Sequence, residues 1–290
     1  MEQPGISIRD VRKSYGSFNL GPVHMEIEPG YVVGIVGPNG SGKTTLLRTL
    51  MNLVQPEQGK IEIAGERYPG HEVSIKQRIG YMPESHMGRE DMTVGSLGEF
   101  VSFWYPAWDQ ACWERLQQQW DIAPSAHFRT LSSGQQRRVS FALARVADPD
   151  ILLLDEPTAG VDPFARREMI DEIAHFMQAG ERTVVMATHV MEDVRRLCDY
   201  IALLNNGAFY GMWEKDALLE QWRVFWVDGE PSVTMPGVVR IDPGTPVRIV
   251  TNNPVETEQE LAWEGIQIIR RGSIDLEEIL FFLMREPVAN

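Results

Sequence analysis

Short apolar runs and glycine-rich turns alternate along the first part of the chain. Val23, Met25 and Ile27 are spaced two residues apart, which predicts a strand with one buried face. Residues 31–36 form a continuous apolar run, as in a strand that is buried on both faces. A glycine-rich loop follows, and the apolar spacing after Lys43 predicts a helix. The pattern therefore predicts strands that lead into a loop and a helix.

The same alternation of strands and helices returns in the middle of the chain. Residues 151–154 and 183–187 are short and apolar, which predicts two further buried strands. Between them, Asp162 followed by proline predicts the start of a helix, and Gly180 predicts its end. Residues 201–210 contain an Asn-Asn-Gly turn and predict a hairpin. Together these elements indicate an α/β fold.

Aromatic residues gather between these two regions. Leu97, Phe100, Val101 and Trp104 have helical spacing, which predicts one amphipathic helix, and residues 111–120 predict a second. We interpret the aromatics as the core of a small helical subdomain, because large aromatic side chains dominate protein cores; a ligand site is the alternative. The four tryptophans of this segment are Trp104, Trp108, Trp113 and Trp120.

The last seventy residues have a different texture. Short β runs at 224–227, 247–250 and 266–269 are separated by turns rich in proline and glycine. A final helix is predicted near Asp275, which has capping-box spacing to Glu278. We expect a small α+β domain over residues 221–290, after a first domain over residues 1–220.

Composition and charge narrow the classes of function. The chain has 290 residues and a formal net charge of −14, so we expect no nucleic-acid partner, because phosphate binding needs a concentrated basic surface. Its two cysteines, Cys112 and Cys198, favour a reducing compartment over a disulfide framework. No apolar run reaches 18 residues, and the first residues lack the features of a signal peptide. We therefore expect neither a membrane span nor secretion by the usual route.

The loop before Lys43 carries the clearest chemical motif. It fits G-x-x-x-x-G-K-[ST], with a buried strand before it and a helix after it. Such a loop wraps phosphate oxygens with backbone N–H groups, places its lysine on the β- and γ-phosphates, and offers a hydroxyl to Mg²⁺. A structural turn with a solvated lysine is the alternative. The predicted nucleotide-binding residues here are Gly37, Pro38, Asn39, Gly40, Ser41, Gly42, Lys43, Thr44 and Thr45.

Two later strand ends carry the complementary chemistry. The run 151–154 ends in Asp155 and Glu156; we predict that Asp155, with Thr44, binds Mg²⁺ and that Glu156 takes a proton from the attacking water. His189 follows the strand at 183–187, where it would face the ligand crevice and stabilise the transferring phosphate. The sequence thus predicts a site for Mg-ATP, with Lys43, Glu156 and His189 as catalytic residues.

The string Leu-Ser-Ser-Gly-Gln at 131–135 resembles the signature motif of ABC-type ATPases, and the order of motifs matches over about residues 6–215. The resemblance implies a P-loop NTPase with a RecA-like core, an antiparallel β subdomain and an ABC helical subdomain at about 86–145. It implies that two such domains enclose ATP head to tail. The signature residues Ser132, Ser133, Gly134 and Gln135 would then contact nucleotide held by the opposite subunit.

Other family positions carry over one by one. Tyr15 resembles the aromatic residue that stacks on adenine, with core packing as the alternative. Residues 159–162, which end in Asp162, resemble the loop through which the paired subunits communicate. Where the family usually has glutamine, this chain has Glu84, which we expect to keep a role in metal sensing and in coupling. Ser133 replaces a glycine of the usual signature.

The tail and the segment 103–109 are similar to prokaryotic exporter ATPases of the antibiotic- and lantibiotic-resistance group. The resemblance implies an ATPase that is cytoplasmic and peripheral at the inner face of the cell membrane. It would pair with a second ATP-binding subunit, identical or different, and power export through integral membrane permease subunits. The alternative is a soluble ABC ATPase that acts as a regulatory switch or as a switch associated with nucleic acid or the ribosome.

Overall fold

The computed structural model describes residues 5–85, 91–232 and 235–285. The chain divides into two compact units, Met1–Met212 and Trp213–Asn290, each of which is described by itself. The boundary between them falls eight residues before the predicted domain boundary at 220–221. Parts of three predictions lie outside the described residues: the start of the chain, residues 86–90 of the helical subdomain, and residues 286–290. Within the described part of the chain, no helix combines the length and apolarity that crossing a bilayer requires.

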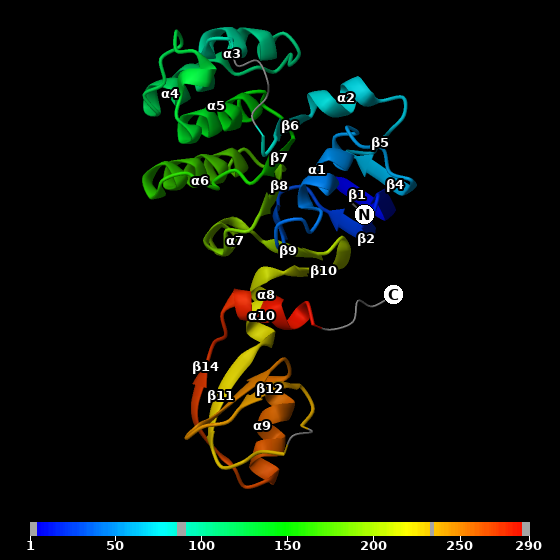
Figure 1. Cartoon of the computed structure of the whole chain (residues 1–290), viewed down its shortest axis with the longest axis vertical. Helices are drawn as coiled ribbons and strands as arrows, with labels where there is room; N and C mark the ends of the chain where they lie inside the picture. The colour runs from blue at the N-terminus through cyan, green and yellow to red at the C-terminus, as the bar shows by residue number, and fades with distance from the viewer. Residues whose placement is uncertain (1–4, 86–90, 233–234, 286–290) are drawn as a thin grey trace. The chain divides into compact units, whose positions relative to one another are not determined.

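A six-stranded sheet with the strand order β10-β9-β3-β8-β7-β6 forms the centre of the first unit (Figure 1). The strands β9, β3, β8, β7 and β6 run parallel. Three of them are buried along their whole length, as the continuous apolar runs predict. Because parallel strands end at one edge, the loops that follow β3, β7 and β8 meet there. The strands are β3 (Val32–Val36), β6 (Ile79–Met82), β7 (Ile151–Asp155), β8 (Thr183–Thr188), β9 (Tyr200–Asn205) and β10 (Ala208–Glu214).

An antiparallel sheet of order β2-β1-β4-β5 contributes to the same hydrophobic core. In β1 and β2, Ile6 pairs with Ile27 and Ile8 with Met25, so the two alternating apolar patterns face one side. That side shares a core with α1 and with one face of the parallel sheet, which places the loop before α1 over the end of β3. The elements are β1 (Ile6–Tyr15), β2 (Phe18–Ile27), β4 (Gln58–Ile63), β5 (Glu66–Arg67) and α1 (Lys43–Leu50).

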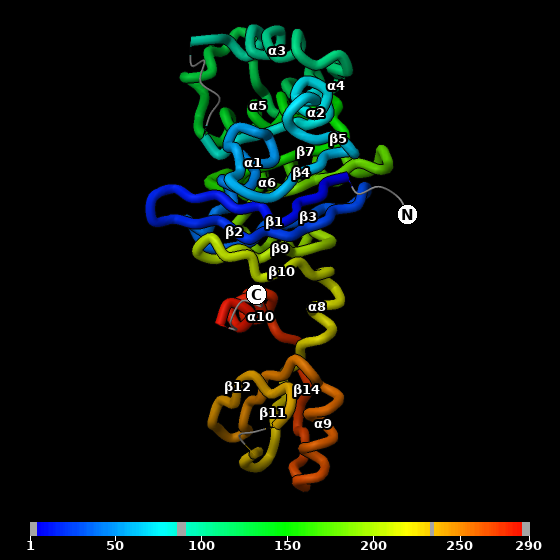
Figure 2. Tube along the Cα trace, turned by 90° about the vertical axis from the view of Figure 1, so that its right-hand side faces the viewer, coloured from blue at the N-terminus to red at the C-terminus, as the bar shows by residue number. Residues whose placement is uncertain are grey.

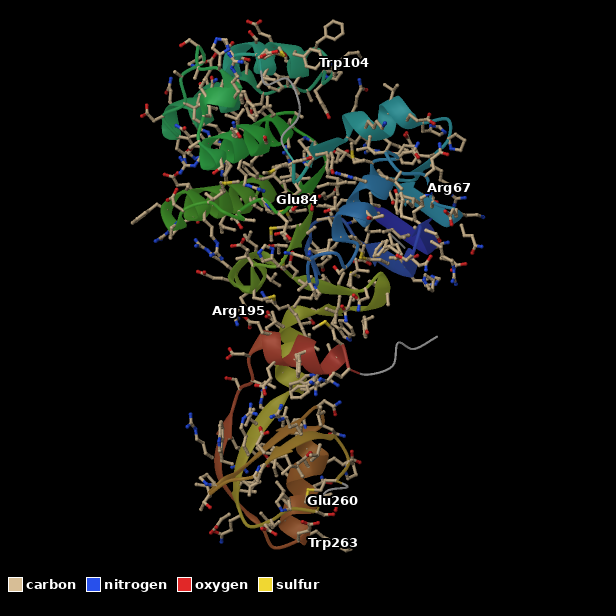
Figure 3. All side chains as sticks on the ribbon, in the orientation of Figure 1. Arg67, Glu84, Trp104, Arg195, Glu260 and Trp263 are labelled. Atoms are coloured by element: carbon tan, nitrogen blue, oxygen red, sulfur yellow. The ribbon has the colours of Figure 1, made fainter. Side chains whose placement is uncertain are left out.

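The remaining helices of this unit include the predicted helical subdomain, where α3, α4 and α5 lie together in both views (Figures 1 and 2). Trp113 and Trp120 are buried there, as expected of a core. The prediction for Trp104 is wrong: α3 ends before it, and its side chain is 58% exposed at the outer side of the subdomain (Figure 3). The helices are α2 (Glu72–Gln77), α3 (Val94–Ser102), α4 (Gln110–Gln119), η1 (Phe128–Thr130), α5 (Ser133–Arg145), α6 (Pro163–Met177) and α7 (Met191–Leu197).

The early end of α3 has a local cause. The backbone turns after Ser102, with the N–H of Trp104 bonded to the carbonyl of Val101. Tyr105 precedes a proline, a position that disfavours helical dihedral angles. Its hydroxyl donates to the carbonyl of Ile79, 3.2 Å away, so the turn is also held from the parallel sheet. The helical spacing of the apolar residues therefore continues past the helix itself.

The second unit is a four-stranded antiparallel sheet of order β12-β13-β11-β14, with α9 packed on one face through Leu261, Phe225 and Ile249. The sequence predicts β11, β13, β14 and α10 but misses three elements, β12, α8 and α9. The predicted capping box is not formed, because Glu278 instead accepts two hydrogen bonds from Arg248. The elements are α8 (Lys215–Gln221), β11 (Arg223–Asp228), β12 (Val238–Asp242), β13 (Val247–Thr251), α9 (Pro254–Trp263), β14 (Gln267–Gly272) and α10 (Leu276–Leu283).

Candidate functional site

The glycine-rich loop lies between the end of β3 and the first turn of α1, as predicted. Gly37 cannot be replaced without movement, because a Cβ there would overlap the carbonyl oxygen of Leu204. Gly42, at the N-cap of α1, has a φ of 107°, which glycine adopts without strain. The loop therefore wraps tightly and leaves the N–H groups at the start of α1 directed at the space above it.

Lys43 is buried under this loop and is not a solvated lysine: its side chain is 6% exposed. Its Nζ donates to the carbonyl oxygens of Gly37 at 2.8 Å and Pro38 at 3.2 Å. It also lies 3.5 Å from Glu156 Oε1. The ammonium group is thus held at the base of the loop by partners that a phosphate could replace.

Thr44 and Asp155 meet beside the lysine, from α1 and the end of β7. The Thr44 hydroxyl donates to Asp155 Oδ1 over 3.1 Å. Burial is the main cause that raises the pKa of Asp155 to about 6, against the Thr44 hydrogen bond; the charges of Glu84 and Glu156 add to the rise. Among the described residues, Asp155 Oδ2 is buried without a hydrogen-bond partner. A buried, unsatisfied carboxylate oxygen next to a hydroxyl fits the oxygen ligand set of Mg²⁺.

Glu156 and His189 form the second pair at this edge. His189 Nδ1 lies 2.8 Å from Glu156 Oε2, and the backbone N–H of His189 donates to the same oxygen at 3.4 Å. Glu156 has a φ of 49°, an unusual value for a residue with a side chain, and its backbone N–H is bonded to the carbonyl of Ala187. Strained backbone of this kind concentrates at functional sites. The strain aims the carboxylate between Lys43 and His189.

Lys43, Thr44 and Glu156 line a pocket of about 520 Å³, together with Phe18, the rest of residues 39–45 and Glu84; Asp155 and His189 contact these lining residues but do not line the pocket. Glu84 lies between the helical subdomain and the sheets (Figure 3) and, although exposed, it faces the pocket. The sequence analysis missed Phe18, which lies against Gly42. An aromatic residue directly after the Gly16-Ser17 turn was the available signal.

Tyr15 lies in the same β1–β2 hairpin as Phe18 but does not line the pocket. Its side chain is 47% exposed and pairs in the β ladder with Phe18, while Lys13 Nζ lies 5.3 Å from its ring centre. Core packing, the alternative reading of this residue, is therefore excluded. The ring remains accessible to a flat partner such as a nucleobase.

The signature segment stands apart from the pocket of its own chain. Ser132 caps α5, accepting the N–H of Gln135, whose side chain accepts the N–H of Ser132. Ser132 and Ser133 are exposed, and Gly134 and Gln135 are partly exposed. Asp162 is likewise an exposed N-cap, here of α6, accepting from Phe164 and Ala165.

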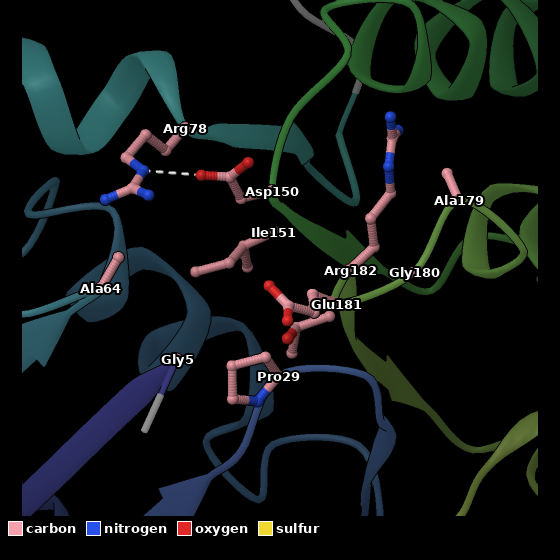
Figure 4. Close-up of a pocket in the computed structure, with 11 residues that line it drawn as sticks. Gly5, Pro29, Ala64, Arg78, Asp150, Ile151, Ala179, Gly180, Glu181 and Arg182 are labelled. Atoms are coloured by element: carbon pink, nitrogen blue, oxygen red, sulfur yellow. Dashed lines mark hydrogen bonds and ion pairs between the residues drawn. The ribbon is translucent and has the colours of Figure 1, made fainter. Parts of the chain in front are cut away.

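A separate pocket of about 690 Å³ lies at the opposite edge of the parallel sheet, where β7 and β8 begin (Figure 4). Gly5, Ile151 and Thr183 line it, and Arg78 donates to Asp150 across 2.6 Å. None of the predicted site residues reaches it. The predicted chemistry is therefore confined to the edge that holds Lys43 and Glu156.

Comparison with known proteins assigns the chain to a family. A family model described as ABC transporter matches residues 20–159. The Nod factor export ATP-binding protein I of Burkholderia orbicola is 34% identical over 221 residues, or 74% of this chain and 72% of that protein. The chain belongs to the ABC transporter family. The ABC transporter ATP-binding protein YtrB of Bacillus subtilis is 31% identical to this ABC subunit over 75% of the chain and 74% of YtrB.

The match covers only part of the length of some relatives, and a solved structure shares the fold. The chain covers 65% of the length of a third relative, the Nod factor export ATP-binding protein I of Ralstonia nicotianae, at 32% identity. A solved structure titled as the ATP-binding subunit of an ABC transporter has a TM-score of 0.68 at 24% identity and covers 74% of this chain and 92% of its own. The predicted family and the P-loop fold class are confirmed.

Proposed function

We propose that this ABC subunit hydrolyses ATP in the pocket above Lys43 and thereby powers export through separate membrane subunits. The observation that carries the proposal is the convergence of Lys43, Thr44, Asp155, Glu156 and His189 at one edge of the parallel sheet. Export is supported by the relatives described as Nod factor export proteins, at 30–34% identity. The substrate in those names is a property of the relatives and is not proposed for this chain. In ABC transporters, the membrane subunits contact the transported substrate.

Nucleotide binding exchanges the partners of Lys43. Its Nζ leaves the carbonyls of Gly37 and Pro38 for the β- and γ-phosphate oxygens, a stronger charge-assisted contact. The N–H groups of residues 39–45 add donors at the positive end of α1. Tyr15 would stack on the base; its exposed ring supports this role.

Thr44 and Asp155 are the residues that would hold Mg²⁺, with Glu84 at the edge of the same pocket. The partnerless oxygen of Asp155 supports this assignment. A bound cation would offset the charge of the phosphates and of the three carboxylates at the site.

Glu156 acts as the general base in this proposal. Its carboxylate accepts a proton from the water that attacks the γ-phosphorus, and the bond to the ADP oxygen breaks. His189 holds Oε2 of the glutamate and orients it, while its half-exposed ring is free to reach the transferring phosphate. Lys43 stabilises the charge that develops on that group.

A second ATP-binding subunit, identical or different, completes the site. The exposed signature residues Ser132 to Gln135, which lie outside the pocket of their own chain, support contact with nucleotide held by a partner. Asp162 would pass the state of one site to the other through its exposed loop.

Membrane subunits would engage the apolar pocket of about 480 Å³ between α2, α3 and α5, lined in part by Phe100, Trp104 and Tyr81. Tyr81 belongs to β6 and lines this pocket, and Glu84, two residues after that strand ends, lines the nucleotide pocket. The arrangement supports a peripheral location at the inner face of the membrane and a coupling role for Glu84.

The decisive experiment compares ATP hydrolysis by the full chain and by Glu156→Gln, alone and with cognate membrane subunits. We expect the variant to lose about 10²- to 10⁴-fold in kcat, as for removal of a general base, while calorimetric ATP affinity survives. No hydrolysis by the unaltered chain in either setting would refute the function. Near-full hydrolysis by the variant would refute the role of Glu156 alone.

A smaller experiment addresses Glu84. Glu84→Ala removes a negative charge that raises the pKa of Asp155, so we expect a changed Mg²⁺ requirement and weaker stimulation by membrane subunits. Glu84→Gln, which restores the residue usual in the family, is the matched variant. Unchanged ATPase activity and unchanged stimulation in Glu84→Ala would show that the residue has no such role.

A further inference from the structure

Asp193, on α7, is a buried carboxylate to which the sequence analysis gave no role. Its residue is 1% exposed. It lies four positions after His189, and it contacts two other segments of the site that are distant in the sequence. Isolated buried charge is costly, so such a group persists only where its partners are well placed.

Both oxygens of this carboxylate are occupied. Oδ2 accepts a hydrogen bond from the hydroxyl of Thr158, which is itself buried. Oδ1 accepts from Arg166 Nε at 2.7 Å. Two donors, one from the loop after β7 and one from α6, thus fix the position of one side chain.

Each partner belongs to a segment that carries a proposed functional residue. Thr158 lies two residues after Glu156, and its carbonyl accepts the N–H of Val161 in the turn that leads to Asp162. Arg166 lies one turn into α6, and its N–H donates to the carbonyl of Asp162 at 2.9 Å. Asp193 therefore joins the Glu156 loop, the Asp162 loop and the helix that follows His189.

The geometry of the catalytic pair depends on these segments. His189 Nδ1 and Glu156 Oε2 are 2.8 Å apart, although one residue follows β8 and the other β7. The Thr158–Asp193 hydrogen bond is a side-chain tie between the segment that follows Glu156 and the helix that follows His189. A shift of one loop against the other would change the pair distance directly.

We propose that Asp193 is a positioning residue, which holds Glu156 and His189 in register with each other and with the Asp162 loop. The inference rests on the proposed ATPase function. Misplacing a catalytic group by about 1 Å from a distant site can cost on the order of 10²-fold in rate, which sets the scale of the effect.

Arg166 provides a matched control within the same cluster. Its Nη1 binds Glu192 at 2.9 Å, and the side chain of Glu192 is 75% exposed. Glu192→Gln therefore removes the exposed carboxylate from this arginine, whereas Asp193→Asn removes the charge of the buried one at nearly constant volume. Only the second substitution disturbs the tie to Thr158.

The experiment measures kcat, KM for ATP and thermal stability of the full chain and both variants. We expect Asp193→Asn to lose about 10- to 100-fold in kcat with KM for ATP little changed, and Glu192→Gln to match the unaltered chain. Equal losses in the two variants, or full activity in a folded Asp193→Asn, would overturn the proposal.

Thr158→Val keeps the assay decisive if Asp193→Asn does not fold, because it removes the tie and leaves both charges paired. We expect its kcat to fall in a chain that stays folded with a somewhat lower melting temperature, because Asp193 Oδ2 loses its buried donor, and we expect Arg166→Lys to retain more activity than Arg166→Ala. Full activity of Thr158→Val would overturn the positioning role. Failure of the unaltered chain to hydrolyse ATP would instead count against the proposed function.

Discussion

The nucleotide loop and the C-terminal unit use buried polar groups in opposite ways. In the described part of the chain, every buried side-chain nitrogen or oxygen atom without a hydrogen-bond partner lies in the first unit. Two of them, Ser41 Oγ and Asp155 Oδ2, are at the nucleotide site. In the second unit the buried hydroxyls of Thr251 and Thr257 bond each other at 2.7 Å. The two oxygens at the nucleotide site are therefore available to a ligand, whereas the buried threonine pair of the second unit is satisfied within the chain.

Two aspartates show the same contrast. Burial, helped by neighbouring carboxylates, raises the pKa of Asp155. In the second unit, burial is the largest single influence on Asp242 and raises its pKa, but the hydrogen bonds and charges of Arg240 and Arg248 together outweigh it, so the pKa is lowered. One carboxylate lacks a cation, and the other already has two. We therefore expect that a substitution at the nucleotide site leaves the first unit folded, whereas a substitution in the hydrophobic core of the second unit lowers its free energy of unfolding.

Leu261→Ala tests the C-terminal side of this contrast and should have the largest effect on stability. Leu261 is fully buried against Phe225 and Ile249, so the cavity should lower the free energy of unfolding by about 2–5 kcal/mol. We expect ATP hydrolysis to stay unchanged below the transition. Val255→Ala, on the exposed side of the same helix, should cost less than about 0.5 kcal/mol in thermal or urea denaturation. Loss of hydrolysis in the folded Leu261→Ala chain would break the contrast.

Asp155→Asn tests the nucleotide side, and its effect on stability should have the opposite sign. A carboxyl with a raised pKa holds its proton more tightly in the folded chain than in the unfolded chain, so its ionisation at pH 7 destabilises the nucleotide-free fold. A rise from 3.8 to about 6 corresponds to about 3 kcal/mol, so the neutral variant should be more stable by up to that amount at pH 7.

The gain from Asp155→Asn should shrink as the pH falls through 6 toward 4, because the unaltered carboxyl then becomes protonated. Denaturation in the presence of EDTA measures it, with exposed Asp228→Asn as the matched control. The same variant should lose its Mg²⁺-dependent stimulation of nucleotide binding. A variant that is less stable at pH 7 would contradict the idea of a site held open at a cost.

Lys43→Ala should have the smallest effect of the three. It removes a charged donor to the phosphates, worth about 1.5–3 kcal/mol, so we expect ATP affinity to fall by about 10- to 100-fold in calorimetry. Lys60→Ala, an exposed lysine of the same unit, is the control. Equal ATP affinity in Lys43→Ala would show that the loop does not bind phosphate through this side chain.

Local patterns made much of the site predictable from sequence. The loop around Lys43 and the strand ends at Asp155 and His189 are continuous motifs, and each lies at the edge of the sheet that its strand position implies. Apolar runs without alternation identified the central strands, because parallel strands are buried on both faces. The N-cap at Asp162 was predictable because it is also a local pattern: its hydrogen-bond partners lie within three residues along the chain.

Contacts between distant residues were out of reach. Thr158 and Asp193 are 35 residues apart, and charged residues on helices are usually solvated, so nothing in the sequence paired them. The helix α9 was missed because one of its buried positions is Thr257, whose hydroxyl is satisfied by Thr251; hydrophobic periodicity does not detect such a residue. Phe18 became part of the site only through the pairing of β1 with β2.

Under the proposed function, the position of Lys43 bears on how fast ADP would leave the site. Because the carbonyls of Gly37 and Pro38 accept from its ammonium, Lys43 has partners within its own loop. Departure of ADP is then a trade of acceptors for this lysine, with no desolvated cation left behind to pull the product back. A loop built this way favours repeated turnover over tight storage of nucleotide.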